Sequence, residues 1–182
     1  MARTRLVFSG SGGQGVITAG IILAETAVLY EGANAVQTQS YGAEARGGAT
    51  RSDVIISDGP IHFPKIIQPN VLVCLTQSAY TRYAPTLRPG GLLITDSGQV
   101  HVERTADARR HELAFSAAVS ERIGNPVVLN ICMLGAVVRL TRVVSADSVK
   151  KGIRDRVPAD FLESNEAAFE LGIELAAAQS PA

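Results

Sequence analysis

Hydrophobic and polar positions along the first hundred residues have the alternating pattern of an α/β fold. Residues 5–9 predict a short buried strand, and residues 16–30 predict a helix that is apolar on nearly every side. A helix so apolar all round is not a surface helix, so we expect it to lie between the sheet and a further element, which hints at a partner surface. Further strands are expected over 33–40, 70–76 and 91–95, and a helix over 77–87.

One segment predicts an antiparallel excursion within this otherwise parallel pattern. Asp58-Gly59 lies between two short extended stretches, 51–57 and 60–63. A two-residue Asp-Gly connection between such stretches is a strong signal for a β-hairpin.

The chain becomes helical in character after residue 100. Helices are expected over 114–122, 127–142, 146–154 and 158–178, with Ser145 as an N-cap and Pro158 in a first turn. The glutamates of the last helix predict a solvated face; they are Glu163, Glu166, Glu170 and Glu174. Strands alternating with helices and then a helical end predict an α/β fold: a Rossmann-like three-layer sandwich, mostly parallel, with a β-hairpin excursion.

Composition narrows the class of partner. The 182 residues suit a single domain, and 17 basic residues balance 17 acidic ones, which argues against nucleic acid or an anionic membrane as the main partner. The N-terminal residues run into a strand without a signal-peptide h-region, and the longest apolar stretch, 127–138, is shorter than the ~20 residues that span a bilayer. We therefore expect a soluble, cytoplasmic protein.

The cysteines and histidines predict no metal centre and no catalytic set. Cys74 and Cys132 each lie in an apolar run, without a CxxC motif, and are expected to be buried thiols. Iron–sulfur clusters usually take about four thiolates, so this chain is not expected to hold one alone. The three histidines show no metal-ligand spacing, and no nucleophile has a recognisable base.

A glycine-rich loop follows the first strand. Gly10, Gly12 and Gly15 fit G-x-G-x-x-G between a strand and a helix, where backbone N–H groups attract an anion. A dinucleotide site also needs an acidic residue about 20 positions further on, and the second strand ends without one, over 36–40. The loop is therefore open to three interpretations: a nucleotide site, a packing turn, or a site for another anionic group.

A second candidate motif occupies residues 39–48, at the carboxyl end of a predicted strand. It reads Gln-Ser-Tyr-Gly-Ala-Glu-Ala-Arg-Gly-Gly, with Tyr41, Glu44 and Arg46 among glycines. Open α/β sheets bind ligands at this edge. An ordinary surface loop with a local ion pair is the alternative, but three glycines make such a loop costly to order without a use.

Together the two motifs resemble the gamma subunit of 2-oxoacid:ferredoxin oxidoreductases. The resemblance rests on residues 8–16, 19–25 and 39–48, continues through 52–58, 69–73 and 90–97, and covers the helical end only loosely. A free-standing chain of this length most resembles the 2-oxoglutarate type. The resemblance implies one gamma-type domain over 1–182, with a core over 3–143 and a helical extension over 144–182.

The family resemblance implies a division of labour. Thiamine diphosphate, magnesium and iron–sulfur clusters are expected in alpha, beta and delta partner subunits, with ferredoxin as acceptor and an acyl-CoA as product. This chain holds no cofactor alone, but both motifs would face the coenzyme A and active-site region, with Arg46 or Arg51 adding charge. The candidate binding residues are Gly10, Ser11, Gly12, Gly13, Gln14, Gly15, Ser40, Tyr41, Gly42, Glu44, Arg46, Gly47 and Gly48.

Two alternatives stay open beside this interpretation. The chain could be a stand-alone nucleotide-binding protein that uses its glycine loop, or a purely structural subunit whose motifs, Glu44 and Arg46 included, only dock a partner chain. The identity of the 2-oxoacid, the stoichiometry and the role of residues 105–122 do not follow from the sequence.

Overall fold

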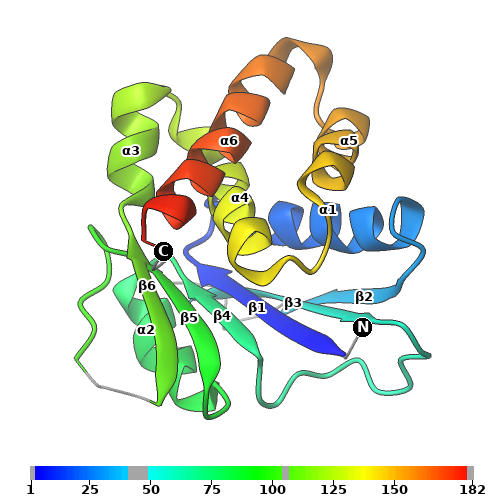
Figure 1. The fold of residues 1–182 in the computed structure, drawn as a ribbon. Helices are drawn as coiled ribbons and strands as arrows, with labels where there is room; N and C mark the ends of the chain where they lie inside the picture. Colours follow the sequence, from blue (N-terminus) through cyan, green and yellow to red (C-terminus); the bar gives the residue numbers. More distant parts are fainter. Residues whose placement is uncertain (1–2, 41–48, 104–106, 180–182) are drawn as a thin grey trace.

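The computed structural model describes residues 3–40, 49–103 and 107–179. One mixed sheet forms the middle layer, with α2 on one face and the remaining helices on the other, as Figure 1 shows. The expected three-layer α/β architecture with a helical C-terminal end is confirmed.

The six-stranded sheet has the order β2-β3-β1-β4-β5-β6. β1, β4, β5 and β6 are parallel to one another, whereas β3 is antiparallel to both β1 and β2. The antiparallel excursion is thus β3, inserted between the first two strands of the chain. The strands are β1 (Thr4–Gly10), β2 (Asn34–Gln39), β3 (Thr50–Ser57), β4 (Val71–Cys74), β5 (Gly91–Asp96) and β6 (Ala108–Leu113).

Alternation along the buried strands divides the core into two clusters. In β1, Leu6 and Phe8 belong to the cluster under the larger helical layer, while Val7 belongs to the cluster under α2 (Gln77–Tyr83). All three side chains are fully buried. Successive side chains of a strand point to opposite faces, so a strand covered on both faces is apolar throughout.

Helix α1 (Val16–Leu29) packs on the sheet and is covered from outside by α5 (Ala146–Arg156). Helices α1 and α5 approach so closely that a Cβ on Gly152 would lie only 2.3 Å from Thr26 Oγ1. The apolar character of α1 is therefore explained largely by another helix of the same chain, and not by a partner surface alone.

Two glycines bring α4 (Leu129–Thr141) and α6 (Leu162–Ala178) into backbone contact. A Cβ on Gly135 would lie 2.1 Å from the Phe169 carbonyl oxygen, and one on Gly172 would lie 1.8 Å from the Cys132 carbonyl oxygen. No larger residue fits such a crossing. With α3 (Phe115–Arg122), these helices complete the larger helical layer.

The prediction of a hairpin at Asp58-Gly59 is wrong. Residues 60–63 form no strand, since both edges of β3 are already paired, with β1 and with β2. Pro60 and Pro64 also lack the N–H groups that a strand needs.

The sequence did not predict β6, the strand at the sheet edge. Arg109, Arg110 and Glu112 are exposed there, so the segment lacks the alternation of a half-buried strand.

Ser145 caps α5 as expected, accepting a hydrogen bond from the Ser148 N–H at 3.1 Å. In the described part of the chain, no helix has the length and apolarity that crossing a bilayer takes.

Candidate functional site

The glycine loop lies at the carboxyl edge of the sheet, between the end of β1 and the start of α1. The loop begins at a firmly held point, because Ser9 Oγ donates a hydrogen bond to the Val73 carbonyl at 2.6 Å. The Leu75 N–H donates to the Ser9 carbonyl at 2.9 Å. These two bonds join the ends of β1 and β4, so the loop starts from a rigid strand end.

The three glycines of the motif meet three different requirements. A Cβ on Gly10 would lie 2.3 Å from Gln14 Oε1, and Gly15 combines a φ of +69° with a Cβ position only 2.7 Å from Asn130 Nδ2. Gly12 differs, because nothing lies within 4 Å of its Cβ position. The left-handed φ and Asn130 therefore require a glycine at position 15, a Cβ on Gly10 would displace the Gln14 side chain, and Gly12 has open space above it.

Side chains from two parts of the chain hold the loop in shape. Gln14 Oε1 accepts a hydrogen bond from the Ser11 N–H at 2.7 Å and so closes the loop on itself. Asn130, a buried residue of α4, donates from Nδ2 to the Gly15 carbonyl at 3.2 Å. Gln14, one of the candidate binding residues, thus closes the loop, and the contribution of Asn130 was not predicted from the sequence.

The outer side of the loop is suited to an anion. Ser11, Gly12 and Gly13 are exposed. The first turn of α1 has no acidic residue and no side-chain cap, so its N–H groups are left for another partner. The N-terminus of a helix carries a partial positive charge of about half a unit, which favours an anionic group there.

Only the flanks of the second motif are described. Residues 41–48, which include the candidates Tyr41, Gly42, Glu44, Arg46, Gly47 and Gly48, lie outside the described residues. Their two flanks are described: the Ser40 N–H donates to the Arg51 carbonyl at 3.2 Å, and Thr50 is the register partner of Gly10. The end of β2 and the start of β3 therefore lie at the edge of the sheet that carries the glycine loop.

The strand order removes the usual place of a ribose-binding carboxylate. In a dinucleotide-binding fold the second strand is the neighbour of the first and brings its acidic residue beside the glycine loop. Here β3 separates β2 from β1, which displaces β2 by one further strand spacing, about 4.8 Å. Both the missing carboxylate and this displacement weigh against a nicotinamide or flavin dinucleotide.

Arg51 does not supply the free positive charge that the sequence suggested. Its guanidinium binds Asp53 through two hydrogen bonds, at 2.6 and 3.0 Å, and donates a third to the Ile66 carbonyl at 2.8 Å. The group also lies 5.2 Å from the Tyr83 ring centroid, on the α2 face of the sheet. Arg51 is thus a structural residue of β3.

Asp96 is a further polar residue of this edge that the sequence analysis did not single out. Its buried carboxylate accepts a hydrogen bond from the Ser116 N–H at 3.0 Å and one from the Gly98 N–H at 3.2 Å. It also accepts from the Ser116 hydroxyl. Asp96 therefore ties the end of β5 to the start of α3, and its position as the last residue of an otherwise apolar strand was the available signal.

The two thiols are buried on opposite faces of the sheet, Cys74 under α2 and Cys132 under the larger helical layer. Burial raises the pKa of each thiol from 9.0 to about 12. Iron–sulfur clusters bind thiolates, whereas a raised pKa keeps both of these thiols protonated. Cys74 and Cys132 therefore do not fit such a cluster. Within the described residues, no group of three His, Cys, Asp or Glu side chains is placed to hold a metal ion.

Fold and site together define a Rossmann-like α/β domain with a solvent-facing glycine loop at its carboxyl edge. The family model described as pyruvate ferredoxin/flavodoxin oxidoreductase matches residues 5–175. The chain belongs to this family, and the resemblance to its gamma-type subunits is confirmed.

Individual relatives agree with this assignment. A 2-oxoglutarate synthase subunit KorC of Methanocaldococcus jannaschii is 48% identical over 176 residues, which cover 96% of this chain and 94% of that protein. The crystal structure of a keto/oxoacid ferredoxin oxidoreductase gamma subunit from Geobacter sulfurreducens has a TM-score of 0.88 and 43% identity, covering 96% of this chain and 99% of the other.

A third likeness concerns the fold alone. The 2-oxoglutarate:ferredoxin oxidoreductase from Magnetococcus marinus, solved with 2-oxoglutarate, coenzyme A and succinyl-CoA bound, has a TM-score of 0.87 at 22% identity. The match covers 100% of this chain and 32% of that chain. The fold of the present chain therefore also occurs as one part of a longer polypeptide.

Proposed function

We propose that this chain is the gamma-type subunit of a 2-oxoglutarate:ferredoxin oxidoreductase and that its glycine loop forms part of the coenzyme A region. In this proposal the complex decarboxylates 2-oxoglutarate oxidatively, forms an acyl-CoA and reduces ferredoxin. Partner subunits hold thiamine diphosphate, magnesium and the iron–sulfur clusters. The printed names of the most similar relatives support 2-oxoglutarate as the substrate.

The observation that carries the proposal is the open space above Gly12. Among the described residues, no heavy atom lies within 4 Å of a Cβ built on Gly12, and the loop around it is exposed. Another molecule can therefore approach the loop backbone closely at this point, directly before the start of α1. Coenzyme A carries phosphate groups, which suit the uncapped N-terminus of α1 directly behind the loop.

The charge of the loop supports the same class of ligand. Residues 10–15 include no acidic side chain. The nearest side chains that hold the loop are the amides of Gln14 and Asn130, which are uncharged. An anionic group therefore meets no like charge within the loop, and backbone N–H groups supply the attraction.

The proposal is tested in the assembled complex with the substitution Gly12→Val. Because the Cβ position of Gly12 is open and its φ is not left-handed, the variant is expected to fold with wild-type stability. The added side chain stands where the ligand backbone contact is proposed. The KM for coenzyme A is then expected to rise at least about tenfold, which corresponds to roughly 1.4 kcal/mol of lost binding, with kcat at saturating coenzyme A changed less than about threefold.

Gly59→Val is the matched control, because nothing lies within 4 Å of its Cβ position either, and it lies at the opposite edge of the sheet. An unchanged KM for coenzyme A in a normally assembled Gly12→Val complex would contradict the proposal. Failure of that variant to assemble, with folding intact, would instead favour a loop that only docks a partner chain.

A further inference from the structure

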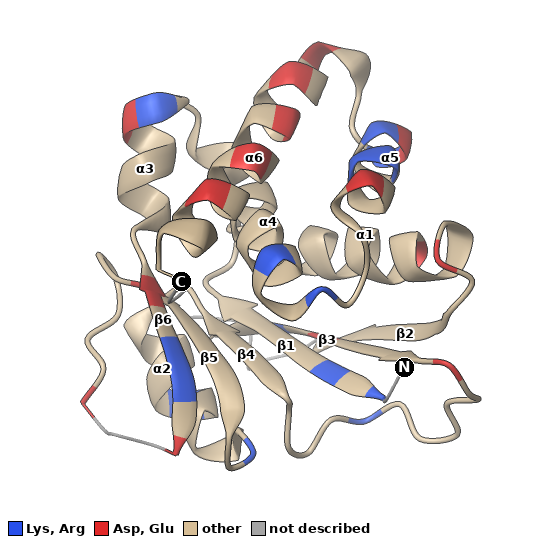
Figure 2. Ribbon diagram, in the orientation of Figure 1, with Lys and Arg blue, Asp and Glu red and all other residues tan. Residues whose placement is uncertain are grey.

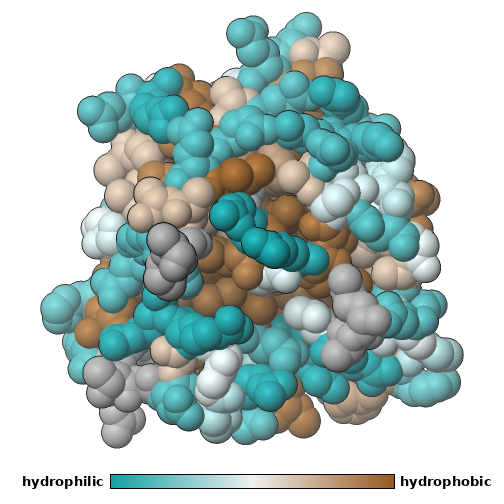
Figure 3. Space-filling view, viewed as in Figure 1, coloured by the Kyte–Doolittle hydropathy of each residue, from teal (hydrophilic) through white to brown (hydrophobic). Residues whose placement is uncertain are grey.

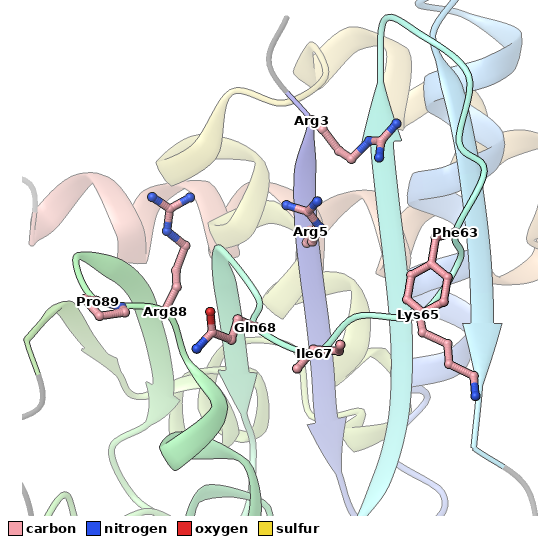
Figure 4. Close-up of a pocket in the computed structure, with 8 residues that line it drawn as sticks. All are labelled: Arg3, Arg5, Phe63, Lys65, Ile67, Gln68, Arg88 and Pro89. Atoms are coloured by element: carbon pink, nitrogen blue, oxygen red, sulfur yellow. The ribbon is translucent and has the colours of Figure 1, made fainter.

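The amino edge of the sheet carries a basic cavity far from the glycine loop. It has a volume of about 670 Å³ and lies between the start of β1, the connection from β3 to β4, and the turn before β5. Figure 4 shows the side chains that surround it. The lining residues are Arg3, Arg5, Phe63, Lys65, Ile67, Gln68, Arg88 and Pro89.

Within the described part of the chain, the basic residues of this cavity have no acidic residue beside them in its lining. Four of its lining residues are basic and none is acidic. Among the residues that the structure describes, Arg5, Lys65 and Arg88 form none of the ion pairs found. Arg3 donates to the neutral Pro60 carbonyl at 2.7 Å and is likewise in none of these ion pairs.

On the helical side of the molecule, several charged side chains form ion pairs. Figure 2 shows acidic residues mainly on the helices, and basic residues both on the helices and along the sheet. Three of the four glutamates of α6 are paired with cations of neighbouring helices. These pairs are Arg122–Glu174 at 2.7 Å, Lys150–Glu170 at 2.5 Å and Arg154–Glu166 at 2.6 Å. Arg109, Arg110 and Arg142 are exposed and also form none of the ion pairs found among the described residues. What sets the amino edge apart is that four cations line one cavity there without an acidic residue among them.

Two apolar side chains accompany the cations. Phe63 is 57% exposed and Ile67 is 74% exposed. Both belong to a connection without regular structure that contains Pro60, Pro64 and Pro69. Figure 3 shows further hydrophobic side chains in the middle of the face turned to the viewer, among hydrophilic ones. Exposed aromatic and aliphatic groups beside arginines have the composition of a protein–protein interface.

The directions of the side chains decide between a small anion and a protein. In Figure 4 the Arg88 group points away on one side, Arg5 lies in the middle, Arg3 points toward the loop, and Lys65 points to the opposite side. A phosphate-sized ligand is bound by groups that converge on one point, which these do not. Cations spread along an edge fit carboxylates spread along a polypeptide.

We propose that this basic edge docks an acidic segment of another protein chain, whose carboxylates pair with Arg5, Lys65 and Arg88 and whose apolar side chains cover Phe63 and Ile67. The inference rests on the proposed function insofar as the partner is taken to be a subunit of the same complex. It assigns a surface opposite the glycine loop to assembly and leaves the coenzyme A region to the carboxyl edge.

The test is a charge reversal measured in the reconstituted complex. Lys65→Glu/Arg88→Glu is compared with Arg110→Glu/Lys151→Glu, which changes the same charge at two exposed cations outside the cavity. The first variant is expected to weaken binding of this chain to the remaining subunits by about 10- to 100-fold, and the control by less than about threefold. The wild-type affinity is expected to fall as salt rises, and that of the first variant to depend on salt much less.

Each outcome decides the inference. Thermal melting first establishes that both variants fold like the wild type. Equal affinities of the two variants would overturn the docking surface while leaving the proposed function in place. A wild-type chain that binds no subunit would overturn both. Micromolar binding of inorganic tripolyphosphate to the isolated wild type, lost in Lys65→Glu/Arg88→Glu, would replace the protein partner with a small polyanion.

Discussion

Replacing Gly15 with alanine tests how the glycine loop is built. Gly15 is the N-cap of α1 and has a φ of +69°, a left-handed conformation that residues with a Cβ rarely adopt. The added Cβ would also lie 2.7 Å from Nδ2, 2.8 Å from Cγ and 3.1 Å from Cβ of Asn130. Asn130 is 6% exposed, so it has little room to move away.

The cost follows from three effects. The left-handed backbone costs an alanine about 1–2 kcal/mol, overpacking against Asn130 about 1–3 kcal/mol, and loss of the hydrogen bond from Asn130 to Gly15 about 1 kcal/mol. Alanine also restricts the unfolded chain, which offsets about 0.4–1 kcal/mol. The free energy of unfolding is therefore expected to fall by about 2–6 kcal/mol, a large part of the roughly 5–15 kcal/mol of a typical domain.

Urea denaturation of the isolated chain measures this loss, with Gly12→Ala as the matched control. Gly12 has open space and no left-handed φ, so its substitution is expected to change the free energy of unfolding by less than about 0.5 kcal/mol. The double variant Gly15→Ala/Asn130→Ala lacks the steric conflict. Its loss of unfolding free energy should therefore be smaller than the sum of the losses in the two single variants. A Gly15→Ala variant as stable as Gly12→Ala would refute the reasoning.

Two further predictions concern the core. In Gly172→Ala the new Cβ would lie 1.8 Å from the Cys132 carbonyl oxygen, so we expect α4 and α6 to separate and the free energy of unfolding to fall by about 3 kcal/mol or more; a melting temperature within about 2 °C of wild type would contradict this. Burial raises the pKa of Cys74 and Cys132 from 9.0 to about 12. Between pH 9 and pH 12 the unfolded state therefore binds fewer protons than the folded state. Stability should therefore fall as pH rises above about 9, and replacing both thiols with alanine should flatten that fall by up to about 2.7 kcal/mol per pH unit; an unchanged slope would show that the thiols are not buried.

Local patterns predicted the elements that are buried on both sides. The apolar runs of β1, β5 and α1 and the N-cap at Ser145 are visible in the sequence because burial and capping act on neighbouring residues. The solvated glutamate face of α6 was also predicted. Its pairing with Arg154, Lys150 and Arg122 was not, since these cations come from other helices.

Features set by distant parts of the chain could not be predicted. Nothing local indicates that β3 enters the sheet between β1 and β2, and the Asp58-Gly59 signal suggested a different partner for it. The glycine spacing indicated a loop, but Asn130 is 115 positions from the Gly15 carbonyl that it binds. Arg51 looked available for a ligand until its bond to Asp53, on the same face of β3, was known.

The most direct test of the central claim is to isolate this chain under gentle, anaerobic conditions from its native cells. The co-purifying chains are identified, and the eluate is assayed for dye reduction that requires both a 2-oxoacid and coenzyme A. The account predicts partners that carry thiamine diphosphate and iron–sulfur clusters, with activity on 2-oxoglutarate above pyruvate and branched-chain 2-oxoacids. A chain that is recovered alone, retains an adenine nucleotide and shows no such activity would contradict it.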